Sequence, residues 1–435
     1  MKRTGQSRRQ FLGTSLGIAA GALTVPYFFS SRARAGQDSD KFRLGSIGVG
    51  GQGTGIMRWA IDTGAELLAV CDVERKHAER AREQTGGKAE IYGDYRKLLE
   101  RKDLDIVTIG TPDHWHTAVC IAALKSGKDV YCEKPLTLTI DEGKLLVKTV
   151  KETGRVLQVG TQQRSDPNLF GRAVATVRSG QLGKIKKVTV SLPLSTEEGG
   201  PFSAQPVPEG LNWDFWLGQT PKVDYCPQRC HFVFRWWYEY SGGIATDWGA
   251  HHMDIAQWGL NVEHSGPLTI DGSSTEMPKI EGGYNTPKRP VIDYTYDGDI
   301  HVQIVTGDEG VLFEGEKGRI YVNRGRITGK PIEEQDADAK LKESIMADVG
   351  KLYHGNVVGN HMANFFEAVR SGGKKPPVSD VVSQHRSVSA CHLGNLSCRL
   401  GRKLAWDPAQ ESFVGDDEAN SMLSRQQRKG YEIEA

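Results

Sequence analysis

The sequence predicts an α/β protein that begins with a doubly wound parallel sheet and continues into an α+β region with an open, mainly antiparallel sheet. A glycine-rich turn joins an early apolar strand to a helix, and strands and helices then alternate as far as residue 159. In the second half, short strands follow one another across tight turns. These three patterns divide the chain into two parts of different architecture.

The composition is that of an ordinary globular protein without an excess of positive charge. Charged residues make up 25% of the 435 positions, and 55 basic residues stand against 54 acidic ones. The first 35 residues hold six of the basic residues and no acid, so the remainder is mildly acidic. A nucleic-acid-binding protein usually carries a basic excess, which this chain lacks. The seven cysteines are sparse and odd in number, which argues against a disulfide framework.

The first 35 residues have the pattern of a twin-arginine signal peptide. Arg8-Arg9 precedes a weakly apolar stretch over 12–29, and Ala33-Arg34-Ala35 forms a small-residue cleavage pattern. The alternative is a retained membrane anchor, although glycines and Pro26 make this stretch a poor transmembrane span. The pattern predicts a periplasmic protein, or one otherwise exported in folded form by the twin-arginine route.

A nucleotide-binding turn follows the first strand of the body. Gly48, Gly50 and Gly53 form a G-x-G-x-x-G pattern, a helix follows, and a second strand ends in Asp72. Glycines at this spacing allow a tight turn and bring backbone N–H groups close to a pyrophosphate at the helix N-terminus. Asp72 lies roughly 20 residues after the third glycine, where an acidic side chain accepts hydrogen bonds from ribose hydroxyls. The motif predicts a Rossmann-type domain that binds NAD.

The choice between NAD and NADP depends on the charges around the ribose. Asp72 would repel a 2′-phosphate, which favours NAD. Arg75 and Lys76 follow closely and leave NADP as the less favoured alternative.

Strands and helices continue to alternate after this turn, which indicates a parallel sheet. Thr139 and Glu142 form a capping box at the start of one helix. The expected strands lie over 42–47, 67–71, 106–110, 129–133 and 156–159. The expected helices lie over 94–102, 118–126 and 139–154, and residues 111–116 form a loop.

Four motifs together resemble the glucose–fructose oxidoreductase / inositol dehydrogenase / MocA (Gfo/Idh/MocA) family of NAD(P)-dependent oxidoreductases. They are Gly48-x-Gly50-x-x-Gly53, Thr111-Pro112-x-x-x-His116, Glu133-Lys134-Pro135 after a strand, and Asp247-Trp-Gly-Ala-His251. The resemblance spans residues 42 to about 258. It implies that Thr111, Pro112 and His116 line the nicotinamide side, and that Glu133 and Pro135 fix the loop that carries Lys134. It also implies a homo-oligomer, either a dimer or a tetramer.

Lys134 and the segment after Gly242-Gly243 are the candidate catalytic positions. Lys134 ends a strand, at the edge where doubly wound sheets bind ligands, and could contact both substrate and nicotinamide. In a helix, Asp247, His251, Asp254 and Trp258 would share one face. His251 is then a candidate general base, oriented by Asp247, although a buried structural histidine is the alternative. His252 points about 100° away and is a weaker candidate for a substrate contact.

The segment before this helix is rich in aromatic residues and contains Cys226-x-x-x-Cys230-His231. Zinc binding by that motif is disfavoured, because no second pair of ligands is nearby in sequence, and we expect no metal. Trp236 and Tyr238 are candidates for stacking on a sugar ring, and core packing is the equal alternative.

The second half predicts a meander of antiparallel strands with flanking helices. Its strands are expected over 186–194, 291–296, 299–306, 310–314 and 318–323, and its helices over 171–179, 361–371 and 381–399. The domains are therefore a signal peptide over 1–35, an NAD-binding domain over 41–162, a substrate-binding and oligomerisation domain over 163–405, and a polar tail over 406–435.

The favoured hypothesis is an exported NAD-dependent oxidoreductase that acts on a hydroxyl group of a sugar, polyol or glycoside. An alternative on the same scaffold is an NAD-dependent enzyme that cleaves glycosides by transient oxidation and elimination. Many family members of that kind depart from Glu-Lys-Pro, so Lys134 favours the first hypothesis. A third hypothesis, from another class, is a periplasmic sugar-binding or sensor protein with a relic cofactor site.

Overall fold

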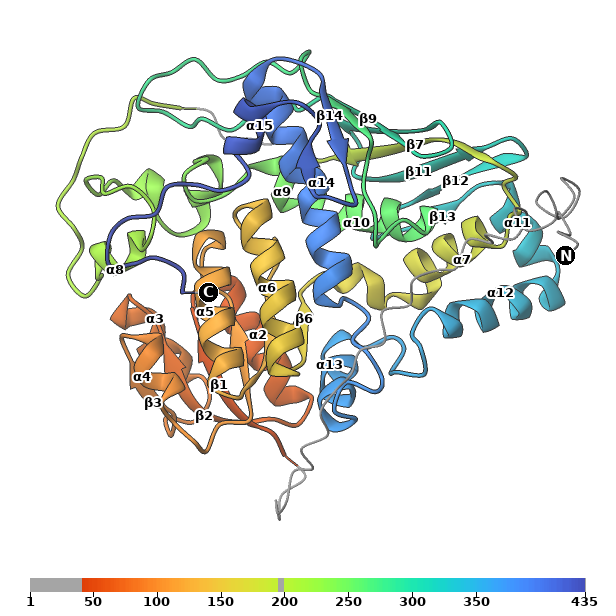
Figure 1. Cartoon of the computed structure of the whole chain (residues 1–435). Coiled ribbons are helices and arrows are strands. Elements are labelled where there is room, and N and C mark those ends of the chain that lie inside the picture. The colour runs from red at the N-terminus through yellow and green to blue at the C-terminus, as the bar shows by residue number, and fades with distance from the viewer. Residues whose placement is uncertain (1–40, 195–198, 435) are drawn as a thin grey trace, which may run out of the picture.

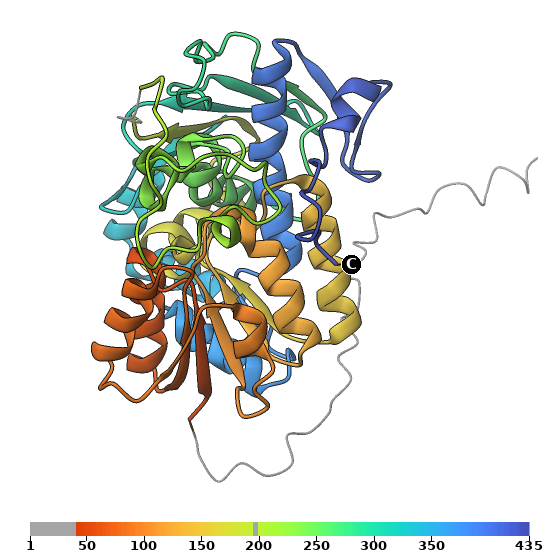
Figure 2. The same ribbon diagram turned by 90° about the vertical axis from the view of Figure 1, so that its left-hand side faces the viewer.

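The computed structural model describes residues 41–194 and 199–434, so the expected signal peptide over 1–35 lies outside the described residues. Two sheets occupy different parts of the molecule, and helices pack between and around them (Figure 1). The view turned by 90° shows the parallel sheet below and the larger sheet above (Figure 2). The fold class predicted from the sequence is confirmed.

The first sheet has six parallel strands in the order β3-β2-β1-β4-β5-β6. This is the strand order of a Rossmann fold, in which ligands bind at the carboxyl ends of β1 and β4, where the chain reverses its direction of winding. The strands are β1 (Arg43–Ile47), β2 (Glu66–Cys71), β3 (Glu90–Tyr92), β4 (Ile106–Ile109), β5 (Asp129–Cys132) and β6 (Leu157–Val159).

The helices between these strands start and end largely where the sequence predicts. The Thr139 side chain accepts a hydrogen bond from Glu142 N, and the helix that it caps ends at Gly154 in a left-handed conformation. Two boundaries differ, because α5 begins at Asp113 inside the stretch expected as a loop and α4 ends at Leu99, short of residue 102. The helix Arg75–Glu83 and the strand β3 are not among the expected elements. The helices are α2 (Gly51–Asp62), α3 (Arg75–Glu83), α4 (Tyr95–Leu99), α5 (Asp113–Lys125) and α6 (Ile140–Thr153).

Two helices from the far end of the chain complete the core of the parallel sheet. On one face, Phe365 and Phe366 of α13 (His361–Arg370) are fully buried, and the Phe366 ring lies 4.9 Å from that of Phe42. On the other face, α14 (Val381–Leu400) contacts α6 and continues along the second region (Figure 1). The two regions are therefore joined by shared helices and not only by a linker.

The second sheet has nine strands in the order β13-β12-β11-β7-β10-β9-β8-β14-β15. The expected meander is wrong in one respect: β7 lies between β10 and β11 and pairs in parallel with β10. The other pairings are antiparallel. The strands are β7 (Ile185–Leu192), β8 (Thr269–Asp271), β9 (Ile292–Tyr296), β10 (Ile300–Thr306), β11 (Gly310–Gly315), β12 (Gly318–Val322), β13 (Ile327–Thr328), β14 (Leu404–Asp407) and β15 (Ser412–Phe413).

Helices of the second region pack on one face of this sheet, between it and the rest of the molecule (Figure 1). The single helix expected after Gly242-Gly243 is divided at Trp248 into α9 and α10. The helical segments of this region are η1 (Gln162–Ser165), η2 (Pro167–Gly171), α7 (Arg172–Arg178), α8 (Trp213–Leu217), η3 (Pro227–Arg229), η4 (His231–Trp236), α9 (Ile244–Asp247), α10 (Gly249–Leu260), α11 (Lys330–Ala337) and α12 (Ala339–Lys351).

The C-terminal tail runs back from the second region to the parallel-sheet region. After α15 (Asp417–Ser421), Arg428 pairs with Asp214, and the Tyr431 ring packs edge-on against Trp115 of α5. All seven cysteines are buried and free. Among the described residues, we find no helix with the length and apolarity needed to cross a membrane.

Candidate active site

The glycine turn after β1 is built by close backbone contacts. Gly48 has a φ of +73°, and a Cβ there would lie 2.6 Å from Thr111 N. A Cβ on Gly53 would lie 1.7 Å from the Gly48 carbonyl oxygen. No side chain fits at either position, so these two glycines hold the turn against the start of α2. At Gly50 a Cβ would meet only the His77 ring, at 3.7 Å, so the second glycine borders open space at the helix N-terminus.

Asp72 follows β2 and holds two backbone segments. Its carboxylate accepts hydrogen bonds from Val49 N at 2.9 Å and from Glu74 N at 2.8 Å. The first bond ties Asp72 directly to the glycine turn, and the remaining lone pairs of the carboxylate can accept hydrogen bonds from a ribose. Arg75 is one of the two cations that could bind the 2′-phosphate of NADP. Its side chain is largely exposed and pairs with Glu79.

Thr111 and Pro112 follow β4, next to the glycine turn. The Thr111 hydroxyl is buried and has no hydrogen-bond partner in the described part of the chain. His116 is also buried, and its two ring nitrogens lie 2.7 Å from Pro135 O and 2.9 Å from Thr111 O. His116 therefore joins the loop after β4 to the loop after β5. These contacts position the two loops, and a place for His116 on the nicotinamide side remains a prediction.

Glu133 fixes the loop after β5 from the inside. Its Oε1 accepts hydrogen bonds from Gln52 Nε2 at 3.1 Å and from Gln162 Nε2 at 3.2 Å. Burial raises the pKa of Glu133. Because Gln52 belongs to the glycine turn, Glu133 connects that turn to the neighbouring Lys134. No sequence motif singles out either glutamine.

Lys134, Asp247 and Arg235 form a network of charges drawn from both regions of the molecule. Lys134 Nζ donates to Asp247 Oδ1 in a short contact and lies 3.2 Å from Asp247 O. Arg235 Nη1 donates to Asp247 Oδ2 at 3.1 Å. The Lys134 and Asp247 side chains are only 18% and 10% exposed. Burial alone would raise the pKa of Asp247, but the two cations outweigh burial and lower it, so Asp247 is ionised.

His251 lies in the first turn of α10, close after Asp247. It is 5% exposed, and its Nδ1 accepts or donates no hydrogen bond among the residues described. Burial, and then the nearby cations Lys134 and Arg324, lower the pKa of His251 well below the ordinary value of a histidine. The imidazole is therefore neutral at neutral pH and able to accept a proton. We refer to Lys134, Asp247 and His251 as the Lys134 cluster.

The break between α9 and α10 separates the expected helix face into two environments. Asp254 does not join the Lys134 cluster, because it makes a buried ion pair with Arg164 at 2.6 Å. The Arg164 guanidinium also lies over the Trp258 ring, 5.0 Å from its centre. Asp254 and Trp258 therefore stabilise the interior of the second region.

The three predicted substrate contacts lie in different surroundings. His252 is fully buried, and its Nε2 lies 2.8 Å from a carboxylate oxygen of Glu309. Trp236 is buried, and its Nε1 has no hydrogen-bond partner among the described residues. The Tyr238 ring lies between two guanidinium groups, those of Arg399 and Arg425, at 3.9 and 3.8 Å. A substrate contact by any of the three remains a prediction.

Asp113 is an acidic group near the Lys134 cluster that the sequence motifs do not single out. It is buried in the first turn of α5 and accepts a hydrogen bond from Ser241 Oγ at 2.5 Å. Burial raises the pKa of Asp113 to about 7, and the charge of Asp247 acts in the same direction. The one signal in the sequence is its position directly after Thr111-Pro112.

Comparison with known proteins agrees with this fold. Residues 42–161 match the family model of an oxidoreductase family with an NAD-binding Rossmann fold, and residues 176–433 match the C-terminal alpha/beta domain of the same family. The chain belongs to the Gfo/Idh/MocA oxidoreductase family. It is 36% identical over 340 residues to the scyllo-inositol 2-dehydrogenase (NAD(+)) of Bacillus subtilis, across 73% of this chain and 82% of that protein.

A second curated protein and one solved structure are also similar to the chain. A glycosyl hydrolase family 109 protein of Shewanella sp. is 34% identical over 170 residues, or 34% of this chain and 37% of that protein. The WlbA dehydrogenase from Chromobacterium violaceum, solved with NADH and UDP-GlcNAcA, has a TM-score of 0.59 at 17% identity, across 85% of this chain and 97% of that one. At that identity the likeness concerns the fold alone.

The residues at the carboxyl ends of β1, β2 and β4 fit NAD. Gly50 leaves room for a pyrophosphate at the N-terminus of α2. Asp72 offers a carboxylate to the ribose, and the unpartnered Thr111 hydroxyl offers a hydrogen-bonding group on the next strand. These residues would hold the dinucleotide across the point where the sheet reverses its winding.

Proposed function

We propose that this NAD-binding oxidoreductase is a dehydrogenase that oxidises a secondary hydroxyl group of a sugar or polyol. The observation that carries the proposal is the Lys134 cluster, in which a neutral, buried His251 lies near a lysine–aspartate ion pair beside the dinucleotide site. A neutral base and a hydrogen-bond donor are the two groups that alcohol oxidation needs from the protein.

Each residue of the Lys134 cluster has a separate task in this proposal. The Lys134 ammonium donates a hydrogen bond to the hydroxyl oxygen of the substrate, and Asp247 holds that ammonium in place. His251 accepts the hydroxyl proton as the carbon–hydrogen bond of the same carbon breaks. When bound, NAD⁺ supplies the acceptor for the hydride, so the alcohol loses one proton and one hydride and becomes a ketone.

Buried polar atoms that have no partner in the described part of the chain support a polyhydroxyl substrate, and they belong to His251 of the Lys134 cluster and to Arg235 and Trp236 of η4. Arg235 Nε, Trp236 Nε1 and His251 Nδ1 are all buried and have no hydrogen-bond partner within the described residues. A buried polar atom without a partner costs about 1–3 kcal/mol. A sugar or cyclic polyol would supply donors and acceptors to all three. The B. subtilis relative is named for activity on scyllo-inositol, so inositols are the first compounds to test.

Cleavage of glycosides is the second candidate function. It is supported by the likeness to a glycosyl hydrolase family 109 protein, although that likeness covers only 34% of this chain. In this reaction the C3 hydroxyl, two carbons from the glycosidic carbon C1, would be oxidised first, and His251 would accept its proton. The ketone would acidify the hydrogen on C2 and so permit elimination of the aglycone from C1. Addition of water to the resulting double bond and return of the hydride to C3 would complete the cleavage without net oxidation. Lys134 favours net oxidation, because many glycosidases of the family depart from Glu-Lys-Pro.

A single set of assays separates these functions. The purified full chain is first denatured, and the released small molecules are analysed by mass spectrometry for NAD. The folded protein is then incubated with inositols, free aldoses and aryl glycosides. NADH formation with a free polyol or sugar supports the dehydrogenase, whereas release of the aryl group without net NADH supports glycoside cleavage. A folded, NAD-loaded protein that does neither would contradict both and favour a sensor.

We further propose that the protein is exported by the twin-arginine route, on the evidence of Arg8-Arg9 and the cleavage pattern at Ala33-Arg34-Ala35. The mature protein should then begin near Gly36, which N-terminal sequencing of the exported form measures. Replacing Arg8-Arg9 by Lys-Lys should retain the protein in the cytosol. An unprocessed N-terminus in the membrane fraction would instead indicate an anchor.

A further inference from the structure

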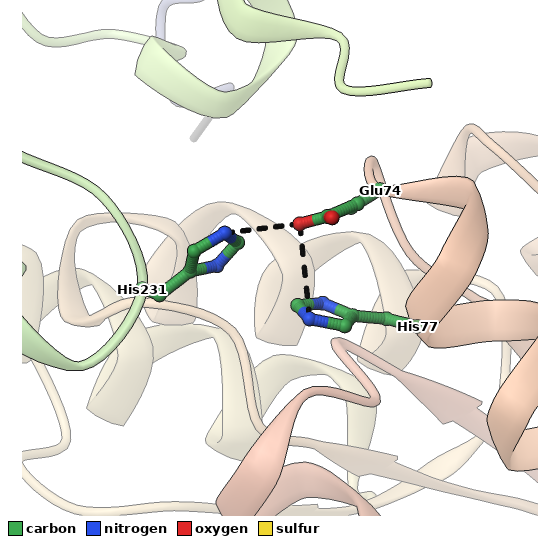
Figure 3. A group of neighbouring side chains, drawn as sticks. All are labelled: Glu74, His77 and His231. Atoms are coloured by element: carbon green, nitrogen blue, oxygen red, sulfur yellow. Dashed lines mark ion pairs between the residues drawn. The ribbon is translucent and has the colours of Figure 1, made fainter. Parts of the chain in front are cut away.

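Three side chains with metal-binding atoms meet where the two regions touch. Glu74 precedes α3, His77 lies in the first turn of α3, and His231 begins η4 in the second region (Figure 3). His231 Nε2 is 3.0 Å from Glu74 Oε2, and His77 Nε2 is 3.7 Å from the same oxygen. We refer to these three residues as the His231 cluster. Their ligand atoms all lie within 4.8 Å of one another.

The distances in this cluster suit a shared metal ion better than direct hydrogen bonds. Glu74 Oε2 is buried and makes no hydrogen bond with any described residue, even though His231 Nε2 is only 3.0 Å away. The nitrogen and the oxygen are therefore close without being aligned for a hydrogen bond with each other. Two ligands on a tetrahedral zinc ion with bonds of about 2.0–2.1 Å are about 3.3 Å apart. The observed 3.0 and 3.7 Å lie on either side of this value.

The second nitrogen of His77 also has the surroundings of a metal-bound histidine. His77 Nδ1 faces Asp72 Oδ2 at 3.6 Å, while Nε2 faces Glu74. A carboxylate on the far nitrogen orients metal-bound histidines in proteins. Asp72 is itself fixed, because it accepts a hydrogen bond from Val49 N of the glycine turn.

The backbone of His231 is held in an unusual conformation. Its φ is +53°, in the left-handed region that residues other than glycine rarely adopt. This conformation brings the imidazole, which is 47% exposed, against Glu74, so the cluster borders solvent on the His231 side. A metal ion therefore has a path of entry.

We propose that Glu74, His77 and His231 bind a divalent metal ion of the zinc class that fastens η4 to the nucleotide-binding region. Two histidines and one carboxylate are a ligand set that zinc accepts, and three protein ligands leave a fourth position for water. The sequence motif offers Cys226, Cys230 and His231 as candidate zinc ligands. The proposed site keeps only His231 from that motif, and the two cysteines are buried and are not ligands.

The position of the ion gives it a consequence for the cofactor. The segment η4 carries His231 at its start and Arg235 near its end, and Arg235 contacts Asp247 of the Lys134 cluster. On the other side, Asp72 touches both His77 and the glycine turn. A bound ion would therefore hold the second region against the ribose end of the NAD site, and we expect it to slow the release of NAD. Metal binding itself does not depend on the proposed dehydrogenase activity.

The experiment uses the full chain without an affinity tag, freed of metal by a chelator and titrated with Zn²⁺ by calorimetry. Elemental analysis then measures the zinc retained per chain. We expect one Zn²⁺ per chain in the wild type, and loss of this binding in His231→Ala and in Glu74→Gln. The matched controls are His301→Ala, which removes an exposed histidine of β10, and Cys230→Ser; both should bind as the wild type does. Asp72→Asn should weaken binding by about 10–100-fold.

Cobalt gives a second readout that reports the ligand geometry. Co²⁺ in place of Zn²⁺ should show the visible absorption of a four-coordinate site in the wild type and lose it in Glu74→Gln, which keeps the size of the side chain. If His231→Ala does not fold, the Zn²⁺ and Co²⁺ measurements on Glu74→Gln test the proposal. The proposal is overturned if the wild type binds no stoichiometric Zn²⁺, if His231→Ala or Glu74→Gln binds it normally, or if Cys230→Ser removes it.

Discussion

The Lys134 cluster and the His231 cluster both form where the two regions meet, but they handle charge differently. In the Lys134 cluster, the Asp247 carboxylate is paired with two cations, Lys134 of the cluster and the neighbouring Arg235. In the His231 cluster, two imidazoles face one carboxylate oxygen that has no hydrogen bond among the described residues. The first arrangement is complete without a further ion, whereas the second has an incomplete set of contacts. This difference separates groups that are ready to act on a substrate from groups that are ready to bind an ion.

The largest effect is expected in the Lys134 cluster. His251→Ala should lower kcat by about 10²–10⁴-fold, because it removes the group that accepts the hydroxyl proton. NAD binding should change little, because the dinucleotide contacts come from the other region. Steady-state kinetics with the best substrate of the panel, together with the Kd for NAD, measure both quantities.

Lys134→Ala and a control complete this test. Lys134→Ala should lower kcat and raise KM, since the ammonium would contact the substrate directly. His264→Ala, an exposed histidine in the loop after α10, should leave both constants unchanged. If the Lys134 cluster were only structural, His251→Ala would lower the melting temperature while the folded fraction kept its turnover. A folded His251→Ala protein with normal kcat would therefore disprove the catalytic role.

The next effect concerns the stability of the protein as a function of pH. The pKa of Asp113 is raised by burial to about 7, from an ordinary value near 3.8. The neutral form is favoured in the fold, so its contribution to stability is complete below pH 3.8 and declines as the pH rises toward 7. Relative to Asp113→Asn, the wild type should lose about 1.4 kcal/mol of unfolding free energy per pH unit over this range, and on the order of 4 kcal/mol in total.

Urea unfolding of both proteins between pH 4 and pH 9 measures this difference. The difference in unfolding free energy between Asp113→Asn and the wild type should grow as the pH rises and become constant above pH 7. Ser241→Ala removes a hydrogen bond that lowers the pKa of Asp113, so its plateau should begin at a higher pH. If the unfolding free energies of the wild type and Asp113→Asn change with pH in parallel, Asp113 is ionised over the whole range. The raised pKa assigned to Asp113 would then be wrong.

A smaller effect is expected for the choice of dinucleotide at the other end of the site. Asp72→Ala removes a charged acceptor, and hydrogen bonds to charged groups contribute about 1.5–3 kcal/mol. NAD should therefore bind about 10–100-fold more weakly, and the preference for NAD over NADP should narrow. Calorimetry on the protein freed of cofactor measures both affinities. A wild type that prefers NADP would contradict the role of Asp72 and direct attention to Arg75 and Lys76.

The sequence predicts those parts of the fold and site that leave a local pattern. Gly48 and Gly53 are required by contacts within one turn, so their spacing is visible in the chain. Lys134 and His251 lie in short motifs at strand and helix ends. His231 lies in a motif too, but its partners come from α3, more than 150 residues earlier in the chain. A local sequence pattern cannot predict a contact between residues so far apart in the chain.

The same limit explains the errors in the second region. The sequence places β10 and β11 next to each other because a short turn joins them, yet β7 lies between them, and its parallel pairing with β10 leaves no signal in the alternation of side chains. The helix after Gly243 has a continuous pattern, but it is divided at Trp248, and Asp254 pairs with Arg164 inside the fold. In each case a tertiary contact overrides the local preference.

The smallest effect is expected for a substitution in η4, the segment that contacts both clusters. It tests whether activity at the Lys134 cluster and Zn²⁺ binding at the His231 cluster can be changed separately. Arg235→Met removes one of the two cations on Asp247 and keeps an apolar chain of similar length. Lys134 still pairs with Asp247 and keeps it in place, so the loss should lie at the low end for a hydrogen bond between charged groups, about 1.5 kcal/mol or roughly a tenfold lower kcat. The pKa of Asp247 should rise, because Arg235 helps to lower it. Zn²⁺ binding should be unchanged, since His231 lies at the other end of η4. If Arg235→Met lowers the affinity for Zn²⁺ by the same factor as kcat, the substitution has disrupted η4. The two clusters would then depend on each other through the fold of η4 and would not be separate sites.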